Sequence, residues 1–254
     1  MVLAVDIGNS NVVIGCFDKD NLTFVDRFAT NRNATALEHA LLIKTALELA
    51  GLAQTAFEGS IISSVVPAVT NAMCAAVEKL TKTAPLLVGP GLKTGLMLKI
   101  ENPSQLGSDR VADAVAATAE YAPPLIVIDM GTATTISVVD KQGAFAGGMI
   151  MPGLRLSTEA LSSKTSQLPQ ISLKKPERAI GRNTVDCMRS GIILGTASIL
   201  DGAIDRIQEE LGYTCTVIST GGNALLVTPH CKHTIHTDED LLLKGLRVLY
   251  YKNA

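Results

Sequence analysis

The alternation of apolar and polar positions predicts short buried strands followed by helices. Continuous apolar runs at residues 2–7 and 12–17 are bounded by the turn-rich segments 8–11 and 18–21. Short apolar runs between such turns are typical of strands. Further strands are expected at 22–28, 60–66 and 86–88, and helices at about 35–50 and 67–82.

The opening pattern returns halfway along the chain. Residues 125–143 parallel residues 3–21 with a single one-residue gap, and both segments give a strand, Asp-x-Gly, a polar loop, a strand and an Asp-Lys turn. Internal similarity of this kind predicts two related domains. Pro123-Pro124 marks the expected junction, which gives domains 1–122 and 123–254. A chance likeness of two β-hairpins is the alternative interpretation.

The second half continues with a strand at 144–150 and a helix from Gly153. A long helix is expected over 184–211, with Thr184 as its N-cap. A strand at 217–219 leads into the glycine turn 220–223, and a helix over 238–250 closes the chain.

Composition excludes several classes of function. Hydrophobic residues make up 47% and charged residues 18%, which supports a packed core and argues against disorder. The net charge of −2 offers no basic face, and aromatic residues are only 4%, so nucleic acid is not an expected partner.

No membrane span or exported form is expected. No run reaches the roughly 18 apolar residues that a span needs, and the longest candidate, 191–200, is followed by Asp201 and Asp205, so a buried helix is expected there. The N-terminus has no pattern of a signal peptide. Five cysteines without a Cys-x-x-Cys pair suit reduced thiols in the cytoplasm.

The two Asp-x-Gly hairpins are the strongest chemical signal. A carboxylate at a strand end can hold Mg²⁺ through water, and the glycine turn after it can wrap phosphate oxygens with backbone N–H groups. One such turn is ordinary hairpin chemistry, whereas a pair facing each other would hold a nucleoside triphosphate. The Walker phosphate loop is absent. Residues 89–95 have the spacing Gly-x-Gly-x-x-x-Gly, which favours a loop over a dinucleotide site.

The duplicated hairpins resemble those of the actin-like superfamily, which includes sugar kinases and the ATPase domains of heat-shock chaperones. Gly107-Ser-Asp-Arg110 fits the Gly-x-Asp-Arg signature of the type III pantothenate kinases. That family's other motifs are similar, in the same order across essentially the whole chain, to Asn102-Pro103, Pro152-Gly153, Gly181-Arg-Asn-Thr184 and Thr220-Gly-Gly-Asn-Ala224. The implied fold is α/β, with two duplicated ribonuclease-H-like domains of mixed sheet flanked by helices and ATP in the cleft between them.

The resemblance implies phosphorylation of pantothenate by ATP to 4'-phosphopantothenate, the first step of coenzyme A synthesis. Asp109 would be the general base, Arg110 would face the anionic substrate, Asp6 would hold Mg²⁺ through water, and Asp129 would bind a monovalent cation, K⁺ or NH₄⁺. The implied ATP contacts are Asp6, Ile7, Gly8, Asn9, Ser10, Asn11, Val12, Val13 and Thr132. The implied pantothenate contacts are Ile100, Gly107, Ser108, Asp109, Arg110 and Thr184, with Thr184 supplied by the second subunit of a homodimer.

Several of these positions have simpler interpretations. Asp109-Arg110 can be a helix-start carboxylate with a surface arginine, on a helix that runs to about Tyr121. Thr184 can be an N-cap only, and the turn 220–222 can either admit adenosine close to the backbone or join a strand to a helix. Many family members have Tyr where this chain has Ile100, so a pocket hydroxyl is missing and another small hydroxyl substrate stays an alternative.

Two further alternatives stay open from the sequence. The cluster His230, Cys231, His233 and His236 suggests zinc, but its spacing fits no usual structural site, and a partly exposed loop leading into a strand is favoured. The whole chain could also be a catalytically silent actin-fold regulator or a kinase of another small hydroxyl substrate. Joint presence of Asp6, Asp109, Arg110 and Asp129 favours the enzyme.

Overall fold

The computed structural model describes residues 1–53 and 55–254 and has a mixed α/β fold. The chain folds into two compact units. The first unit comprises Met1–Leu96, Glu101–Ala116 and Asp240–Ala254, and the second comprises Met97–Ile100 and Ala117–Glu239. The end of the chain therefore belongs to the unit that contains its beginning. The boundary expected between residues 122 and 123 stays a prediction about where the duplicated segments meet.

The first unit is built on a five-stranded mixed sheet. Strands β1 (Val2–Ile7), β2 (Asn11–Asp18) and β3 (Asn21–Ala29) form an antiparallel meander. Strand β4 (Gly59–Ser64) lies parallel to β1 on its other side, and β5 (Leu86–Leu87) lies parallel to β4. The resulting order is β3-β2-β1-β4-β5.

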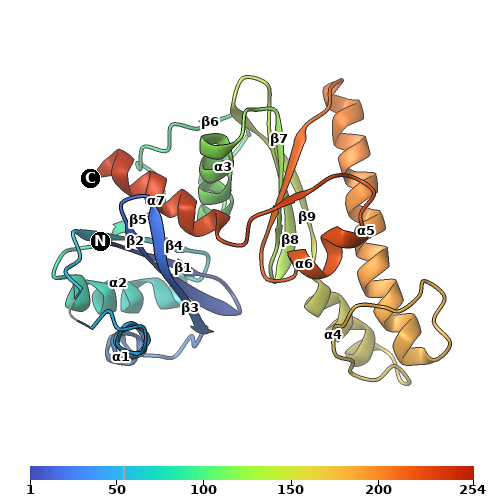
Figure 1. Ribbon diagram of the computed structural model, residues 1–254, viewed down its shortest axis with the longest axis horizontal. Helices are drawn as coiled ribbons and strands as arrows, with labels where there is room; N and C mark the ends of the chain where they lie inside the picture. The colour runs from blue at the N-terminus through green and yellow to red at the C-terminus, as the bar shows by residue number, and fades with distance from the viewer. Residues whose placement is uncertain (54) are drawn as a thin grey trace. The chain divides into compact units, whose positions relative to one another are not determined.

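Helices cover both faces of this sheet. Helices α1 (Ala36–Leu49) and α2 (Pro67–Thr81) lie on one face, as Figure 1 shows, over a core that includes Leu3, Val5 and Ile7. The other face carries Val2 and Ala4, which pack against the start of α3 (Ser108–Glu120) and against α7 (Leu241–Asn253). A side chain at Gly245 of α7 would collide with the backbone of Ala112 of α3, so glycine allows these two helices to cross closely.

The second unit repeats the same strand order. Strands β7 (Leu125–Met130), β8 (Ala133–Val139) and β9 (Ala144–Pro152) form an antiparallel meander. Strand β10 (Thr216–Thr220) is parallel to β7, and β11 (His236–Thr237) is parallel to β10. The order β9-β8-β7-β10-β11 matches the first sheet strand for strand, with the two-residue β6 (Met97–Leu98) added beside β9.

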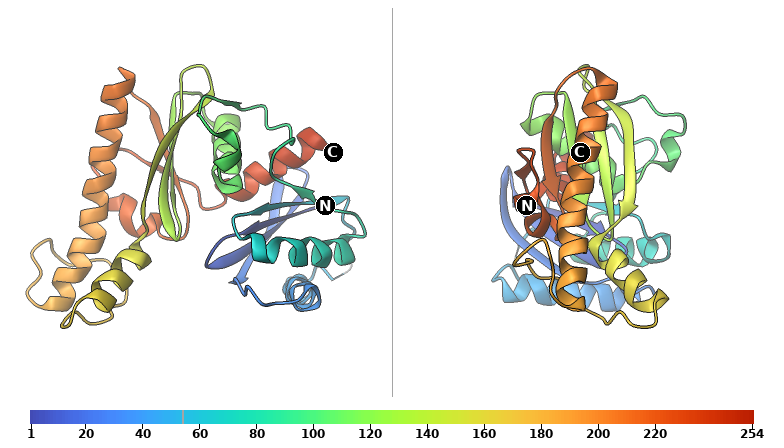
Figure 2. Two further views of the ribbon diagram at one scale, coloured as in Figure 1. Left: turned by 180° about the vertical axis from the view of Figure 1, so that it is seen from behind. Right: turned by 90° about the vertical axis from the view of Figure 1, so that its right-hand side faces the viewer.

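One face of the second sheet packs on helix α5 (Thr184–Leu211), which Figure 2 shows as a long helix beside the strands. The core there includes Ile126, Ile128 and Met130, which take the places of Leu3, Val5 and Ile7 in the first copy. Asp6 and Asp129 alternate with these residues and therefore point to the opposite face of their sheets. The remaining short elements are η1 (Pro103–Gln105), α4 (Leu154–Lys164), α6 (Ala224–Val227) and η2 (Thr228–His230).

The predicted α/β fold with two duplicated mixed sheets is thus confirmed, with local corrections. The N-cap of α5 is Asn183, whose side chain accepts a hydrogen bond of 2.9 Å from the N–H of Asp186, and Thr184 is the first helical residue. The closing helix begins at Leu241 rather than Asp238, and β4 ends at Ser64 rather than Val66. Strand β6 was not expected, because two residues carry no periodic signal.

Helix α5 is long and apolar enough to cross a membrane by length and composition, and half of its most apolar 18-residue window is buried inside the fold. Core helices of soluble proteins pass the same test. The buried side chains include Ile192, Ile193, Ala197, Leu200 and Ile204, which pack on the second sheet.

Candidate active site

The turn after β1 is held from one side by the end of β3. The hydroxyl of Thr30 donates a hydrogen bond of 2.7 Å to the Gly8 carbonyl oxygen, and the Thr30 N–H donates one of 3.0 Å to the Ser10 carbonyl oxygen. The side chains of Asn9, Ser10 and Asn11 are exposed. With its carbonyl groups engaged by Thr30, this turn is suited to present N–H groups and short polar side chains to an anion.

The Gly-Ser-Asp-Arg motif starts helix α3 at the carboxyl end of β4. The Ser108 hydroxyl lies 3.0 Å from that of Ser63, accepts a hydrogen bond of 3.0 Å from the Ser64 N–H and donates one of 3.0 Å to the Ser64 carbonyl oxygen. Ser63 is the register partner of Asp6 in the parallel pair of β1 and β4. The motif and Asp6 therefore meet at one edge of the first sheet.

Asp109 is a partly buried carboxyl group in the first turn of α3. Burial raises its pKa above the usual range, and the N–H and charge of Arg110 act in the opposite direction. The Arg110 N–H donates a hydrogen bond of 2.7 Å to Asp109 Oδ1. A side chain at Gly107 would collide with the same Oδ1 atom, so the motif's glycine leaves room for the carboxylate. A raised pKa in such a setting is typical of a group that takes up protons in catalysis.

Arg110 is surrounded by charge of the opposite sign. Burial lowers the pKa of its guanidinium group, while the carboxylates of Asp109 and Asp113 act to raise it. Asp113 follows one helical turn after Asp109 and is 2% exposed. Arginine remains charged under such conditions and can pair with an anionic substrate through its planar fork.

The second hairpin is enclosed by two glycine turns. Gly221, at φ +87°, has no room for a side chain because the Asp129 carboxylate and the Met130 backbone lie against it. The Asn223 side chain donates a hydrogen bond of 3.2 Å to the Met130 carbonyl oxygen. Gly153 packs on the backbone that leads to Thr132, and its N–H donates a bond of 3.2 Å to the Thr132 carbonyl oxygen. Asp129, Thr132 and the turn 220–222 are thus brought together at one end of the second sheet.

Ile100 follows a segment that is fixed to the second sheet by an ion pair. Lys99 Nζ lies 2.6 Å from Asp140 Oδ2, and the other oxygen of Asp140 accepts hydrogen bonds from the N–H groups of Gln142 and Ala144. Lys99 and these N–H groups lower the pKa of Asp140 despite its burial. The aspartate of the second Asp-Lys turn therefore also fixes the residues that precede Ile100.

Thr184 is the exposed first residue of α5, and the loop before it is tied to that helix. The Ser190 hydroxyl donates to the Ala179 carbonyl oxygen at 2.5 Å, and a side chain at Gly181 would collide with the backbone of Cys187. Both contacts hold the residues before Thr184 against the first two turns of the helix. No contact in the described part of this unit uses the Thr184 side chain as a cap, because Asn183 has that role.

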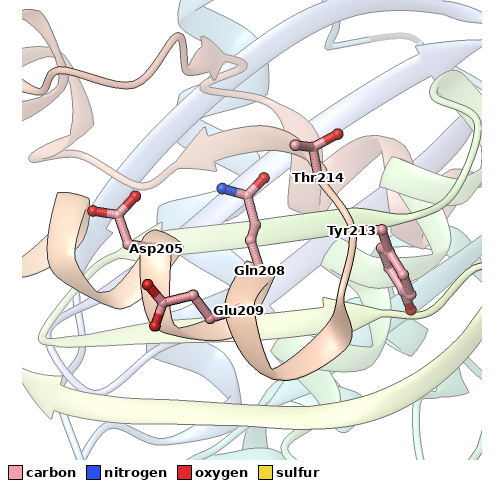
Figure 3. A pocket seen from close by; sticks show the side chains of 5 residues that line it. All are labelled: Asp205, Gln208, Glu209, Tyr213 and Thr214. Atoms are coloured by element: carbon pink, nitrogen blue, oxygen red, sulfur yellow. The ribbon is translucent and has the colours of Figure 1, made fainter.

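The second unit has two other features. An open depression of about 320 Å³ is lined by Asp205, Gln208, Glu209, Tyr213 and Thr214 (Figure 3). Its carboxylates would repel a triphosphate. Among residues 1–53 and 55–254, no group of three or more His, Cys, Asp or Glu side chains is placed to hold a metal. His233 Nε2 instead lies 2.8 Å from Asp205 Oδ1, and the rings of His236 and Tyr121 lie tilted to each other with their centroids 5.8 Å apart.

The residues that support the motifs are not predicted by any sequence pattern. Ser63 and Ser64 hold Ser108, Thr70 holds Ser64 at 2.8 Å, and Thr30 holds the first turn. The only available signal for Ser63 and Ser64 was a pair of hydroxyl residues directly after an apolar run. Such a pair is also a common way to end a strand.

Comparison with known proteins identifies the family. The family model described as type III pantothenate kinase matches residues 2–206. A type III pantothenate kinase of Exiguobacterium sibiricum is 43% identical over 253 residues, covering 100% of both chains. One from Brevibacillus brevis is 43% identical over 255 residues, covering 100% of this chain and 99% of its own.

Solved structures agree on the fold. The activator of the 2-hydroxyisocaproyl-CoA dehydratase from Clostridium difficile, solved with bound ADPNP, has a TM-score of 0.58 at 10% identity, over 99% of this chain and 94% of its own. The ROK hexokinase from Thermus thermophilus has a TM-score of 0.53 at 13% identity, over 98% and 97%. Both neighbours have actin-like ATPase or sugar kinase folds. The chain belongs to the type III pantothenate kinase family, and its activity is the ATP-dependent phosphorylation of pantothenate in coenzyme A synthesis.

Proposed function

We propose that Asp109 is the general base that accepts the proton of the pantothenate hydroxyl while the γ-phosphoryl group is transferred. The observation that carries this proposal is the attachment of Ser108 to the end of β4, one strand away from Asp6. The attachment brings a carboxyl group with a raised pKa to the sheet edge that carries the first Asp-x-Gly turn. A base poised in this way can contribute on the order of 10²–10⁴-fold to the rate.

The phosphate groups of ATP are assigned to the two Asp-x-Gly hairpins. Residues 6–13 and Thr132 would contact the nucleotide, and Asp6 would hold Mg²⁺ through water. One carboxylate beside an exposed polar turn fits this ion, which keeps several waters and binds mainly through substrate phosphates. When bound, Mg²⁺ neutralises charge on the transferring phosphoryl group. Asp129 would bind the monovalent cation, since its carboxylate lies against the glycine backbone at 221.

Pantothenate is assigned to the start of α3 and to two other segments. Arg110 would pair with the pantothenate carboxylate, and the backbone of Gly107 and Ser108 would lie along the substrate. Ile100 would give an apolar contact, and the Lys99–Asp140 ion pair would fix its position. Thr184 would complete the pocket from a second subunit.

A homodimer formed through α5 would supply Thr184 in trans. Support comes from a small-residue face on this helix, which consists of Cys187, Gly191, Gly195, Ser198 and Gly202. Added Cβ atoms at Gly191 and Gly195 would meet nothing within 4 Å, and the adjacent Ile199 is 55% exposed. Small residues let a partner helix approach closely. We place the enzyme in the cytoplasm, where its five free cysteines would stay reduced.

A mixed dimer tests the base and the shared pocket together. Asp109→Asn and Thr184→Ala would each inactivate their own homodimer. In the heterodimer, one pocket carries both defects and the other carries neither, so up to half of the wild-type activity per dimer is expected to return.

Differently tagged subunits, copurified so that heterodimer formation is verified, make the result decisive. The control is a dimer of two differently tagged subunits that both carry Asp109→Asn, and it should stay inactive. A fully active monomer in sedimentation, or no recovery in verified heterodimers, would contradict the shared pocket.

A further inference from the structure

The hydroxyl group of Ser108 is fully used inside the protein. A serine hydroxyl donates one hydrogen bond and accepts two. Ser108 donates to the Ser64 carbonyl oxygen and accepts from the Ser64 N–H, and the Ser63 hydroxyl lies 3.0 Å away. Because the single donor of Ser108 goes to Ser64, the Ser63 hydroxyl must be the donor in the third bond. The Ser108 hydroxyl is therefore an anchor, and only the backbone of this residue is left for a substrate.

Ser63 is well placed to fix this anchor. Its side chain is 0% exposed and lies on the same face of the sheet as Asp6, its register partner in β1. The next residue, Ser64, is itself held by the start of α2, through a bond of 2.8 Å between its hydroxyl and that of Thr70. The Thr70 hydroxyl in turn donates to the Val66 carbonyl oxygen at 3.1 Å. The start of α2 is thus linked to the first residue of α3 through Ser64, whose hydroxyl contacts Thr70 and whose backbone N–H and carbonyl groups bind Ser108.

We infer that Ser63 is a positioning residue for Asp109, acting through the hydroxyl of Ser108. This inference rests on the proposed role of Asp109 as the base. Asp109 directly follows Ser108 on the first turn of α3, so any movement of Ser108 moves the carboxylate. A general base must lie within about 2.6–3.2 Å of the group that it deprotonates. Misplacement by about 1 Å can cost on the order of 10²-fold in rate.

The second copy of the fold allows a comparison with the positions of Ser63 and Ser64. There the residue paired with Asp129 is Thr220, and the next residue is Gly221, which lies against Asp129. The first copy has Ser64 in the place of that glycine, and its N–H and carbonyl groups both bind Ser108. A hydroxyl residue beside the aspartate is thus present in both copies, and in the first copy the residue after it binds the start of α3 through its backbone.

Ser63→Ala tests the inference, and Ser60→Ala is its matched control. Both serines lie on β4 and are almost fully buried, at 0% and 1% exposed. The Ser60 hydroxyl has no hydrogen-bond partner among the described residues, so its removal is expected to leave kcat unchanged. Ser63→Ala is expected to lower kcat by about 10- to 100-fold, with the Kd of ATP changed less than about threefold.

The pH profile separates positioning from a general loss of structure. Burial raises the pKa of Asp109, and a loosened α3 would admit water to the carboxyl group. The acid limb of the kcat profile is therefore expected to move to lower pH in Ser63→Ala, and not to move in Ser60→Ala. If the substitution only destabilised the fold, the amount of folded enzyme would fall and the acid limb would stay at the same pH.

Ser108→Ala removes the bond to Ser63 together with the two bonds to Ser64, and it carries the test if Ser63→Ala does not fold. Since Ser63 acts through Ser108, the double variant is expected to be no slower than Ser108→Ala alone. The inference would be overturned if the losses of kcat in the two single variants multiplied in the double variant. A wild-type kcat and pH profile in Ser63→Ala would also overturn it. Full activity of Asp109→Asn would instead remove the base assignment itself, so the two failures are distinguishable.

Discussion

Asp129 and Thr220 are register partners at the carboxyl ends of the parallel strands β7 and β10. Asp6 and Ser63 stand in the same relation in β1 and β4. Each copy of the fold therefore presents a carboxylate beside a hydroxyl residue at the end of its central strand. Ligands of α/β sheets bind outside the carboxyl ends of the strands. The aspartate and the hydroxyl residue of each copy therefore stand at a ligand-binding position of their sheet.

Activity is expected to require K⁺ or NH₄⁺ in addition to Mg²⁺. Asp129→Ala should remove the response to the monovalent cation, because it deletes the carboxylate beside Gly221. Rates measured across K⁺, NH₄⁺ and Na⁺ titrations at fixed Mg·ATP check this. Asp140→Ala is an unsuitable control because it frees Lys99, whereas the exposed Asp26→Asn should keep the wild-type response. Full activity in Na⁺ alone would contradict the assignment.

Small and large substitutions on the small-residue face of α5 are expected to have different effects on subunit stability and on the dimer. Gly191→Ala should stabilise the helix by up to about 1 kcal/mol, because alanine has the higher helix propensity and its Cβ has free space in the subunit. Gly191→Leu should keep a folded subunit but weaken the dimer, since a large side chain holds the partner helix away. Sedimentation velocity and thermal unfolding measure the two effects. A dimer unchanged by leucine at residues 191 and 195 would place the interface elsewhere.

His39 of α1 is expected to make the first unit sensitive to acid. The side chain is 0% exposed, and neither ring nitrogen has a hydrogen-bond partner within the described segments. Burial lowers its pKa, so the unfolded state binds the proton more readily and stability falls as the pH drops below about 6.5. His39→Phe should therefore raise the free energy of unfolding more at pH 5 than at pH 8. Equal gains at both pH values in urea titrations would argue against this effect.

Much of the fold follows from patterns that the sequence displays locally. Strand β1 and helix α5 have the bounds that their apolar runs predict, and the repeated Asp-x-Gly turns predict the duplication. The prediction of Thr184 as the N-cap was wrong, because Asn183 has that role and both residue types cap helices well. The packing of α7 on the first sheet and the bond between Ser63 and Ser108 join residues far apart in the chain. No local pattern encodes such contacts.

The ionisation of Asp109 should affect both kcat/KM and the free energy of unfolding, and in opposite directions. Its carboxyl group must be ionised to accept a proton, so kcat/KM is expected to fall as the pH drops through a pKa that lies above the ordinary 3.8. A raised pKa also means that ionisation destabilises the fold. Asp109→Asn should therefore be more stable than the wild type at pH 7, and this difference should vanish below about pH 3.8. Urea unfolding between pH 3.5 and 8, at intervals of about half a unit, would reveal it.

The most direct test of the proposed mechanism is the turnover number of Asp109→Asn, measured by ADP formation with saturating pantothenate, Mg·ATP and K⁺. We expect kcat to fall by about 10²–10⁴-fold, because the amide cannot accept the hydroxyl proton. ATP binding measured by calorimetry should stay within a few-fold of wild type, and the exposed Asp26→Asn should retain full activity. A turnover number within a few-fold of wild type in Asp109→Asn would contradict the assignment of the base.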